Sequence, residues 1–416
     1  MSNKTKHAPP KSGDKPALSP KLRFPEFRDA EGWKSKRLAE LFSDRQESGL
    51  SGLPLLSLMD KEGIVPQENS NRKNNSNSDK SKYLRVVPGD IAYNTMRMWE
   101  GRSAYVGLEG LVSPAYTVCK PEAGVHGQLF AYYFKTPQFI EQFRRYSQGL
   151  VKDTLNLKYE AFSKIDVLTP TYSEQQKIAE CLSSLDELMA AQARKLDALK
   201  THKKGLMQQL FPREGETQPR LRFPEFQNAG EWEEKRISSV IDLISGMHLS
   251  PDAYSTSGEV PYFTGPSDFT NDIQDVTKWT NRTANTSQAE DTLITVKGSG
   301  VGEIWYSTLA EVAMGRQLMA VRTKDGSSRF IFQFLLTKRS RFEDLGSGNL
   351  IPGLSRAAIL DMEACFPSPP EQQRIADCLT TVDDLITAQT QKLAALKTHK
   401  QGLMQQLFPS SEAVEA

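Results

Sequence analysis

Two stretches of the chain carry an apolar stripe whose steps alternate between four and three residues. Each stripe is interrupted only by one glutamine and one lysine. This stepping predicts a long helix with a coiled-coil seam, along which it packs against a second helix. The first stripe consists of Ile178, Leu182, Leu185, Met189, Gln192, Leu196, Leu199, Lys203, Leu206 and Leu210, and the second of Ile375, Leu379, Val382, Ile386, Gln389, Leu393, Leu396, Lys400, Leu403 and Leu407.

Local signals mark the two ends of each predicted helix. Thr171-x-x-Glu174 and Ser368-x-x-Glu371 match the capping box that begins helices. Pro212 and Pro409 follow the last apolar positions and end them. A helix of about 38 residues would be about 57 Å long at about 1.5 Å per residue.

The seam must be buried against a partner, because a lone helix leaves it exposed. We expect the two helices to pair with each other, antiparallel if a pseudo-two-fold axis crosses the seam. A swapped dimer would satisfy the same seams. The matched Gln192, Gln389, Lys203 and Lys400 would then set register and orientation at some cost in stability. Alternatively, the lysines extend into solvent from a frayed helix end.

The chain is one unit written twice. Residues 205–212 (Gly-Leu-Met-Gln-Gln-Leu-Phe-Pro) return unchanged at 402–409, and residues 22–27 (Leu-Arg-Phe-Pro-Glu-Phe) return at 221–226. A repeat of roughly 200 residues is a duplicated domain rather than a solenoid unit. Gly205 and Gly402 each cost a helix about 1 kcal/mol relative to alanine, which a close backbone contact would explain.

The segments between the repeated edges, 39–165 and 238–363, barely resemble each other. Both show short strands, such as Ile91 to Asn94 and Thr292 to Lys297, beside short helices. We therefore predict an α+β protein with two mixed α/β domains separated by two long antiparallel coiled-coil helices. Trp33 and Trp232, in the repeated edges, are expected to pack each domain on a helix base.

The predicted boundaries follow from these features and from composition. Residues 69–77 form a polar loop within the first domain. The predicted segments are a disordered tail at 1–18, the first domain at 19–170, the first helix at 171–212, the second domain at 213–367, the second helix at 368–409 and a tail at 410–416.

Composition excludes several classes of protein. With 52 basic and 51 acidic residues, the net charge is +1, so any nucleic-acid surface must be local. Four cysteines without a CxxC pair fit a reduced intracellular protein. The five histidines show no metal-ligand spacing. Without an apolar run of about 20 residues or a secretory signal, a cytoplasmic protein is expected.

Taken together, these features resemble the specificity (DNA-recognition) subunit of type I restriction–modification systems. The resemblance extends from about Lys21 to Pro409. Residues 22–27 with Trp33, and their copy with Trp232, carry it. So do Pro-x-x-x-Glu-Gln-x-x-Ile-Ala at 170–179, its copy at 367–376, and the long leucine helices.

The resemblance implies two target recognition domains, each reading one half of a bipartite asymmetric site in double-stranded DNA. It implies that the helices set the spacer and dock two adenine-N6 methyltransferase subunits, to which motor/endonuclease subunits are added. S-adenosylmethionine, ATP and Mg would belong to those partners, so this chain is expected to be non-catalytic and cofactor-free. It contains no GxxxxGK[ST] or Asn/Asp-Pro-Pro-Tyr/Phe motif.

Two other classes of function remain as alternatives. A coiled-coil scaffold presenting two protein-binding domains would share the repeated helices. A self-contained enzyme is disfavoured by the missing catalytic motifs.

Base readout requires amide, hydroxyl or cationic side chains aimed at base edges. The first domain offers segments 93–102 and 148–152, and the second offers 246–248, 262–265, 315–317, 346–349 and the Gly-rich loop 297–302, which lacks GxGxxG spacing. Alternatively, Tyr93 and Trp99 are core residues, the arginines are merely solvated, and His248 is a polar loop residue. The predicted DNA contacts are Asn94, Arg97, Trp99, Arg102, Gln148, Lys152, His248, Thr264, Lys297, Ser299, Arg316, Gln317 and Asn349.

Overall fold

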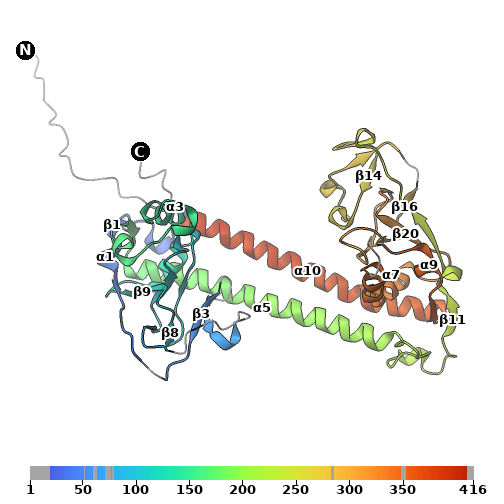
Figure 1. Cartoon of the computed structure of the whole chain (residues 1–416), viewed down its shortest axis with the longest axis horizontal. Coiled ribbons are helices and arrows are strands. Elements are labelled where there is room, and N and C mark those ends of the chain that lie inside the picture. Colours follow the sequence, from blue (N-terminus) through green and yellow to red (C-terminus); the bar gives the residue numbers. More distant parts are fainter. Residues whose placement is uncertain are drawn as a thin grey trace, which may run out of the picture. The chain divides into compact units, whose positions relative to one another are not determined.

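The computed structural model describes residues 19–50, 52–59, 63–70, 76, 79–282, 285–347 and 353–409. Both predicted tails, most of the polar loop at 69–77, and Asn349 lie outside these residues. The chain forms two compact units: unit 1 is Met1–Ala191 with Leu393–Ala416, and unit 2 is Gln192–Lys392. Each unit contains one divergent domain and part of both long helices, α5 (Tyr172–Leu210) and α10 (Pro369–Leu407) (Figure 1).

Both domains are built on the same four-stranded antiparallel sheet. In unit 1 its order is β2-β9-β6-β7, and in unit 2 it is β12-β20-β17-β18. The strands of unit 1 are β2 (Phe42–Asp44), β6 (Ile91–Asn94), β7 (Ser103–Tyr105) and β9 (Tyr116–Pro121). Those of unit 2 are β12 (Ile241–Ser245), β17 (Thr292–Thr295), β18 (Ile304–Tyr306) and β20 (Leu318–Thr323). Each strand therefore has a counterpart in the other half, in the same chain order.

A second group of strands is repeated as well. In unit 1, β3 (Leu56–Met59) pairs with β4 (Gly63–Pro66), and β5 (Leu84–Val86) pairs with β8 (Gly110–Val112). A parallel bridge from Leu55 to Leu111 joins the two pairs. In unit 2, β15 (Trp279–Thr280), β14 (Val260–Phe263), β19 (Glu311–Met314) and β16 (Thr286–Gln288) follow the same order, with β14 parallel to β19, and β13 (Tyr254–Ser255) is added beside β15. Two segments with little sequence similarity thus share one topology.

The remaining strands and helices also occur in matched sets, whereas among the described 3-10 turns only the first of each unit has a counterpart. In unit 1 they are β1 (Lys34–Arg37) paired with β10 (Asp166–Thr169), α1 (Leu38–Leu41), α2 (Gly127–Tyr133), α3 (Pro137–Tyr146), α4 (Tyr159–Phe162), and the 3-10 turns Pro25–Phe27, Gln67–Asn69, Met98–Glu100 and Lys152–Thr154. In unit 2 they are β11 (Glu233–Arg236) paired with β21 (Glu363–Phe366), α6 (Ile237–Val240), α7 (Ser328–Thr337), α8 (Arg339–Ser347), α9 (Arg356–Leu360), and the 3-10 turns Pro224–Phe226, Pro251–Ala253, Pro266–Asp268 and Ile273–Asp275.

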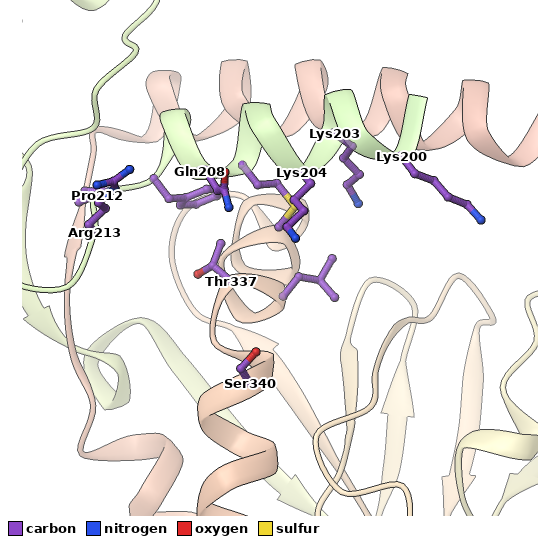
Figure 2. A pocket seen from close by; sticks show the side chains of 11 residues that line it. Lys200, Lys203, Lys204, Gln208, Pro212, Arg213, Thr337 and Ser340 are labelled. Carbon is purple, nitrogen blue, oxygen red and sulfur yellow. The ribbon is translucent and has the colours of Figure 1, made fainter. Parts of the chain in front are cut away.

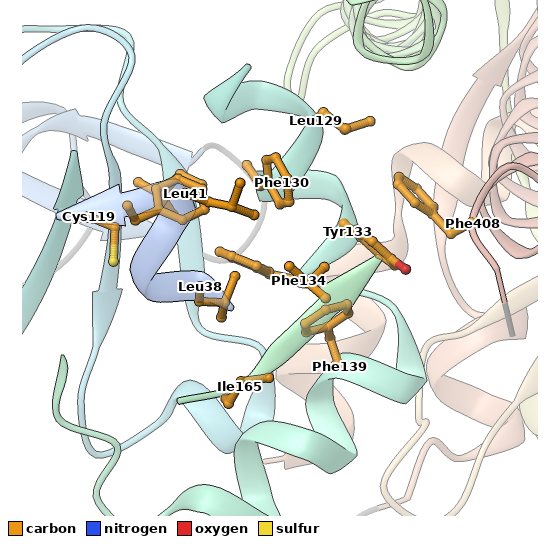
Figure 3. Packing of buried hydrophobic residues seen from close by; sticks show 14 of the residues in the cluster. Leu38, Leu41, Cys119, Leu129, Phe130, Tyr133, Phe134, Phe139, Ile165 and Phe408 are labelled. Atoms are coloured by element: carbon orange, nitrogen blue, oxygen red, sulfur yellow. The ribbon is translucent and has the colours of Figure 1, made fainter. Parts of the chain in front are cut away.

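The core of each unit includes the end of a long helix that begins in the other unit. In unit 1, Phe408, which directly follows α10, stacks on Tyr133, with ring centroids 4.4 Å apart (Figure 3). In unit 2, Phe211, which directly follows α5, packs on Phe330, with ring centroids 5.3 Å apart. All four side chains are buried. This shared burial explains why the Leu-Phe-Pro helix ends are identical.

The long helices run antiparallel within each unit. In unit 1, Leu182 near the start of α5 shares a core with Leu407 near the end of α10. In unit 2, Leu210 shares one with Leu379. Every predicted seam position of both helices is buried or half-buried. The expected α+β fold class, with two domains of repeated topology and long antiparallel helices, is confirmed.

The polar seam residues pair across the helices. Gln389 donates a hydrogen bond to the side chain of Gln192. Nζ of Lys203 lies 2.7 Å from Oδ1 of Asp383, and Nζ of Lys400 lies 2.6 Å from Oδ1 of Asp186. The lysines therefore form interhelical ion pairs, and the alternative of a frayed end is wrong.

The close backbone contact considered for the two helix glycines is also wrong within this chain. A Cβ atom added at Gly205 or Gly402 would have no other atom of the described residues within 4 Å. The helix therefore bears the propensity cost of glycine without a packing reason inside the protein.

Candidate nucleic-acid interface

Four separate segments of unit 2 meet around the turn 315–317, which precedes β20. The amide of Gly315 donates to the carbonyl of Phe263 at 2.8 Å, and Val296 donates to Gln317 at 2.7 Å. A Cβ on Gly246 would lie 2.1 Å from the carbonyl oxygen of Gly315, so only glycine fits there. Residues 246–248, 264–266, 297–300 and 315–317 therefore form one surface, called loop cluster 2.

The side chains of loop cluster 2 are mostly accessible. His248, Lys297, Ser299 and Arg316 are exposed, and Gln317 is half-buried. Gln317 Oε1 lies against the glycine backbone, 3.1 Å from where a Cβ on Gly265 would stand. Neither Lys297 nor Arg316 forms an ion pair with any residue that the structure describes. Two cations on one loop surface are suited to phosphate contacts.

Thr264 is already committed to an internal network. Its amide and its hydroxyl both lie 2.7 Å from Oδ2 of Asp268, and Nζ of Lys278 lies 2.9 Å from the hydroxyl. Burial alone would raise the pKa of Asp268, but the hydrogen bonds from Thr264 and the charge of Lys278 outweigh it and lower that pKa. The carboxylate therefore stays charged, and Thr264 holds the loop in place rather than offering a free hydroxyl donor.

The two predicted segments of unit 1 also meet. Leu157 donates a backbone hydrogen bond to Thr95 at 2.8 Å, which anchors the end of the 148–156 loop to the β6–β7 turn. Nζ of Lys152 lies 5.3 Å from the ring centroid of Trp99, a cation–π contact. Residues 94–102 and 148–152 are called loop cluster 1.

Individual residues of loop cluster 1 differ in their freedom. Asn94 accepts from the amide of Met96 at 3.0 Å and so shapes the turn. Trp99 is half-buried, and its indole N–H donates to the carbonyl of Met96. Arg97 and Arg102 lie 3.6 and 3.8 Å from the carboxylate of Glu100. Gln148, Lys152 and Arg97 are exposed.

The two loop clusters occupy equivalent places in the repeated topology. The β6–β7 turn corresponds to the β17–β18 turn, because Leu157 bonds to Thr95 as Leu354 bonds to Val296, both at 2.8 Å. The segments predicted separately in the two halves therefore lie at equivalent edges of the two corresponding sheets, one in each unit. Asn349 lies outside the described residues, although the nearby Gly353 bridges to Lys297.

One segment was missed by the sequence reasoning. The turn 113–115 precedes β9 just as 315–317 precedes β20, and Thr95 bonds to Ala115 as Val296 bonds to Gln317. It therefore belongs to loop cluster 1. Its Ser-Pro start is a turn signal that could have been matched to Gly315 by position in the repeat.

The base of each domain is held by a buried carboxylate on the first turn of a long helix. Glu174 accepts from Arg23 at 2.8 and 2.7 Å and from the indole N–H of Trp33 at 3.3 Å. Glu371 accepts in the same way from Arg222 and Trp232. The hydrogen bonds to Glu174 raise the pKa of Arg23. The predicted capping-box role of the glutamates is therefore wrong, whereas the packing role of both tryptophans is confirmed by their burial.

The neighbouring glutamine completes this base. Gln175 accepts from the amide of His126 at 2.8 Å and donates to the carbonyl of Pro170 at 3.0 Å. Gln372 makes the same pair of bonds with Ser327 and Pro367. The repeated Glu-Gln is thus a docking point for the strand–helix connection of each domain.

A further contact ties each domain to both helices. The hydroxyl of Tyr132 donates to Asp186 at 2.7 Å, and Asp186 also binds Lys400. In unit 2, Gln333 donates to Asp383 at 2.7 Å, and Asp383 also binds Lys203. Each aspartate therefore connects a domain helix, α2 or α7, to the opposite long helix.

Unit 2 has a pocket of about 770 Å³ beside the end of α5. Figure 2 shows its lining side chains on the last turns of that helix, near Thr337 and Ser340. The lining is cationic, with Lys200, Lys204 and Arg213. In unit 1, the corresponding helix end is tied down, because Gln138 donates to the carbonyl of Pro409 at 2.7 Å.

Among the described residues, no group of three or more His, Cys, Asp or Glu side chains is placed to hold a metal ion. No helix in the same residues is long and apolar enough to cross a membrane.

Comparison with known proteins agrees with this architecture. A family model described as "Type I restriction modification DNA specificity domain" matches residues 229–398. The putative type I restriction enzyme MjaX specificity subunit of Methanocaldococcus jannaschii is 24% identical over 350 residues, covering 79% of this chain and 80% of the relative. The MjaVIII specificity subunit of the same organism is 23% identical over 185 residues, 43% of each chain.

Solved structures share the fold. The S subunit of a type I restriction–modification system from M. genitalium has a TM-score of 0.64 at 14% identity, covering 94% of this chain and 100% of that one. A chain from a structure of type I restriction–modification complex assembly has a TM-score of 0.55 at 18% identity, covering 91% and 98%. The fold is thus that of a specificity subunit. Residues 229–398 thus match a type I restriction modification DNA specificity domain, and over most of its length the chain is similar to the specificity subunits of these systems.

Proposed function

We propose that loop clusters 1 and 2 each read one half of a bipartite, asymmetric site in double-stranded DNA. The observation that carries this proposal is that the two domains share one topology but present different side chains at the equivalent edge of their sheets. Loop cluster 1 presents Arg97, Trp99 and Lys152 where loop cluster 2 presents Lys297 and Arg316. Different side chains on one frame suit two different half-sites.

In this proposal, α5 and α10 set the unread spacer and dock two adenine-N6 methyltransferase subunits. Motor/endonuclease subunits join that core to cleave unmodified DNA. S-adenosylmethionine, ATP and Mg act on those partners, and this chain supplies recognition without catalysis. The matched polar pairs along the helices support a register-defined spacer, because a slip of either helix would separate each lysine from its aspartate.

The proposal is tested by expressing the chain with its methyltransferase partner and sequencing methylated adenines in the host genome. One recurring split motif is expected. Arg97→Ala should relax or weaken the half read by unit 1 only, and Arg316→Ala the half read by unit 2 only. Lys120→Ala, an exposed lysine near the far end of β9, is the control. A protein-binding scaffold would give no methylated motif.

The spacer is tested separately. Deleting residues 189–195 together with 386–392 removes facing seven-residue segments and leaves both lysine–aspartate pairs in place. Each helix would shorten by about 10 Å at about 1.5 Å per residue. The spacer should then lose about three base pairs or activity should be lost, with both half-sites unchanged. Altered half-sites with the original spacer would contradict this role of the helices.

A further inference from the structure

The tip of the loop after α3 exposes apolar side chains without cover. Leu150 is 102% exposed and Val151 is 61% exposed. A fully exposed leucine forgoes about 1.5–3 kcal/mol that its burial would contribute. An apolar side chain held out in this way indicates a partner surface.

The backbone of this loop is well anchored. Gln148 and Asn156 exchange two hydrogen bonds of 2.9 and 2.8 Å, and Thr154 donates to the carbonyl of Val151 at 2.9 Å. Gly149 has φ +135°, and a Cβ there would lie 2.5 Å from the carbonyl oxygen of Thr154. The loop is therefore a tight hairpin that holds Leu150 outward, not a chain that can fold back over its own apolar tip.

The surroundings of the tip identify the partner. Lys152, two residues away, stacks on Trp99 of the β6–β7 turn, and Met96 in that turn is 48% exposed. Arg97 in the same turn is also exposed. Apolar side chains interleaved with cations suit a nucleic-acid duplex, because the cations meet phosphates while the apolar groups reach the bases.

We propose that Leu150 is a wedge that enters a base-pair step beside the half-site read by unit 1, while Lys152 lies on the flanking phosphate. The wedge rests on the proposed DNA-reading function of loop cluster 1. Inserted leucines partly unstack a step and bend the duplex, and the energy of unstacking is offset by burial of the side chain and by added contacts. The first half-site therefore includes a deformability requirement at a position with no polar contact.

The test uses the full chain assembled with its methyltransferase partner. Duplexes carry the methylation-mapped site with 2-aminopurine at successive positions through and beside the first half-site. Apart from the target adenines, which the methyltransferase itself flips out of the stack, the wild-type complex should raise 2-aminopurine fluorescence at one step. Leu150→Ala should abolish that signal, weaken binding on the order of tenfold and relax the preference at that step, while the bases read by polar contacts stay the same. Leu150→Met, which keeps a long apolar side chain, should retain both the fluorescence signal and the wild-type affinity.

Folding does not confound this test, because Leu150 is fully exposed and its replacement removes no core contact. Leu108→Ala is the matched control: Leu108 is 46% exposed and follows β7, at the end opposite the β6–β7 turn. It should leave binding and fluorescence unchanged.

Two outcomes would overturn the wedge. One is specific binding by the wild type with no unstacked step. The other is a Leu150→Ala complex that keeps the fluorescence signal but assembles poorly with the methyltransferase, which would make Leu150 a protein contact. By contrast, a wild-type complex that neither methylates nor binds a split site would refute the DNA-reading proposal itself.

Discussion

Lys400 reaches across the helix pair to place its Nζ 2.6 Å from Oδ1 of Asp186. Asp186 also accepts from Tyr132, so one carboxylate joins a domain helix to both long helices. Removing either partner should lower the free energy of unfolding. A double-mutant cycle of Asp186→Asn and Lys400→Met should give a coupling energy of about 1 kcal/mol, measured by urea unfolding. Asp197→Asn, on the exposed face of α5, should change little.

The carboxylate at each domain base should matter more than any surface ion pair. Glu174→Gln leaves the charge of Arg23, whose side chain is only 7% exposed, without its counter-ion. Loss of one partner of a buried pair costs about 3–5 kcal/mol, so the free energy of unfolding should fall and the urea midpoint should move to a lower concentration. Glu371→Gln should produce a similar loss. Glu26→Gln, which removes only a solvent-exposed pair with Lys177, should leave the unfolding transition nearly unchanged.

Gly205→Ala and Gly402→Ala should stabilise the free chain. Each site has open space for a methyl group, and alanine favours a helix interior over glycine by about 1 kcal/mol. Thermal unfolding of the single and double variants measures the gain. A destabilised free chain would show that the open space around these glycines is filled in solution.

Stability should fall under mildly acidic conditions through His126. Burial lowers the pKa of His126, against a smaller opposing effect of Glu180. As pH falls through the unfolded-state pKa of about 6.5, the unfolded chain binds the proton first, so this contribution to stability is present above that pH and lost below it. His126→Asn should flatten the dependence of urea unfolding between neutral and mildly acidic pH. An unchanged slope would assign the acid sensitivity to other groups.

Lys297 and Arg316 should each contribute to DNA affinity by contacting either a phosphate or a base edge. The salt dependence of the affinity distinguishes these two kinds of contact. If the side chain binds a phosphate, its substitution by alanine should reduce the slope of log affinity against log salt by about 0.9. If it binds a base, the substitution should instead relax specificity at one position. Fluorescence anisotropy of the assembled complex at several salt concentrations measures the slope. Lys120→Ala should leave it unchanged.

The loop clusters show where sequence reasoning reached its limit. Segments 246–248, 297–302 and 315–317 were each proposed from composition, but only strand pairing brings them onto one surface. Thr264 stays a predicted DNA contact, and its network with Asp268 and Lys278 depends on residues that come together only in the fold. The turn 113–115 was missed because its place depends on the register of β9 against β6.

The sequence by itself determined the duplication, the two helices and their seam, because an apolar period of about 3.5 residues and a repeated stretch can both be read along the chain. It also indicated the family through the repeated edges. Only the tertiary structure decided that Glu174 binds Arg23 and Trp33 rather than capping its helix, and that the seam lysines pair with Asp186 and Asp383. Those choices depend on distances between residues far apart in the chain, which no local pattern records.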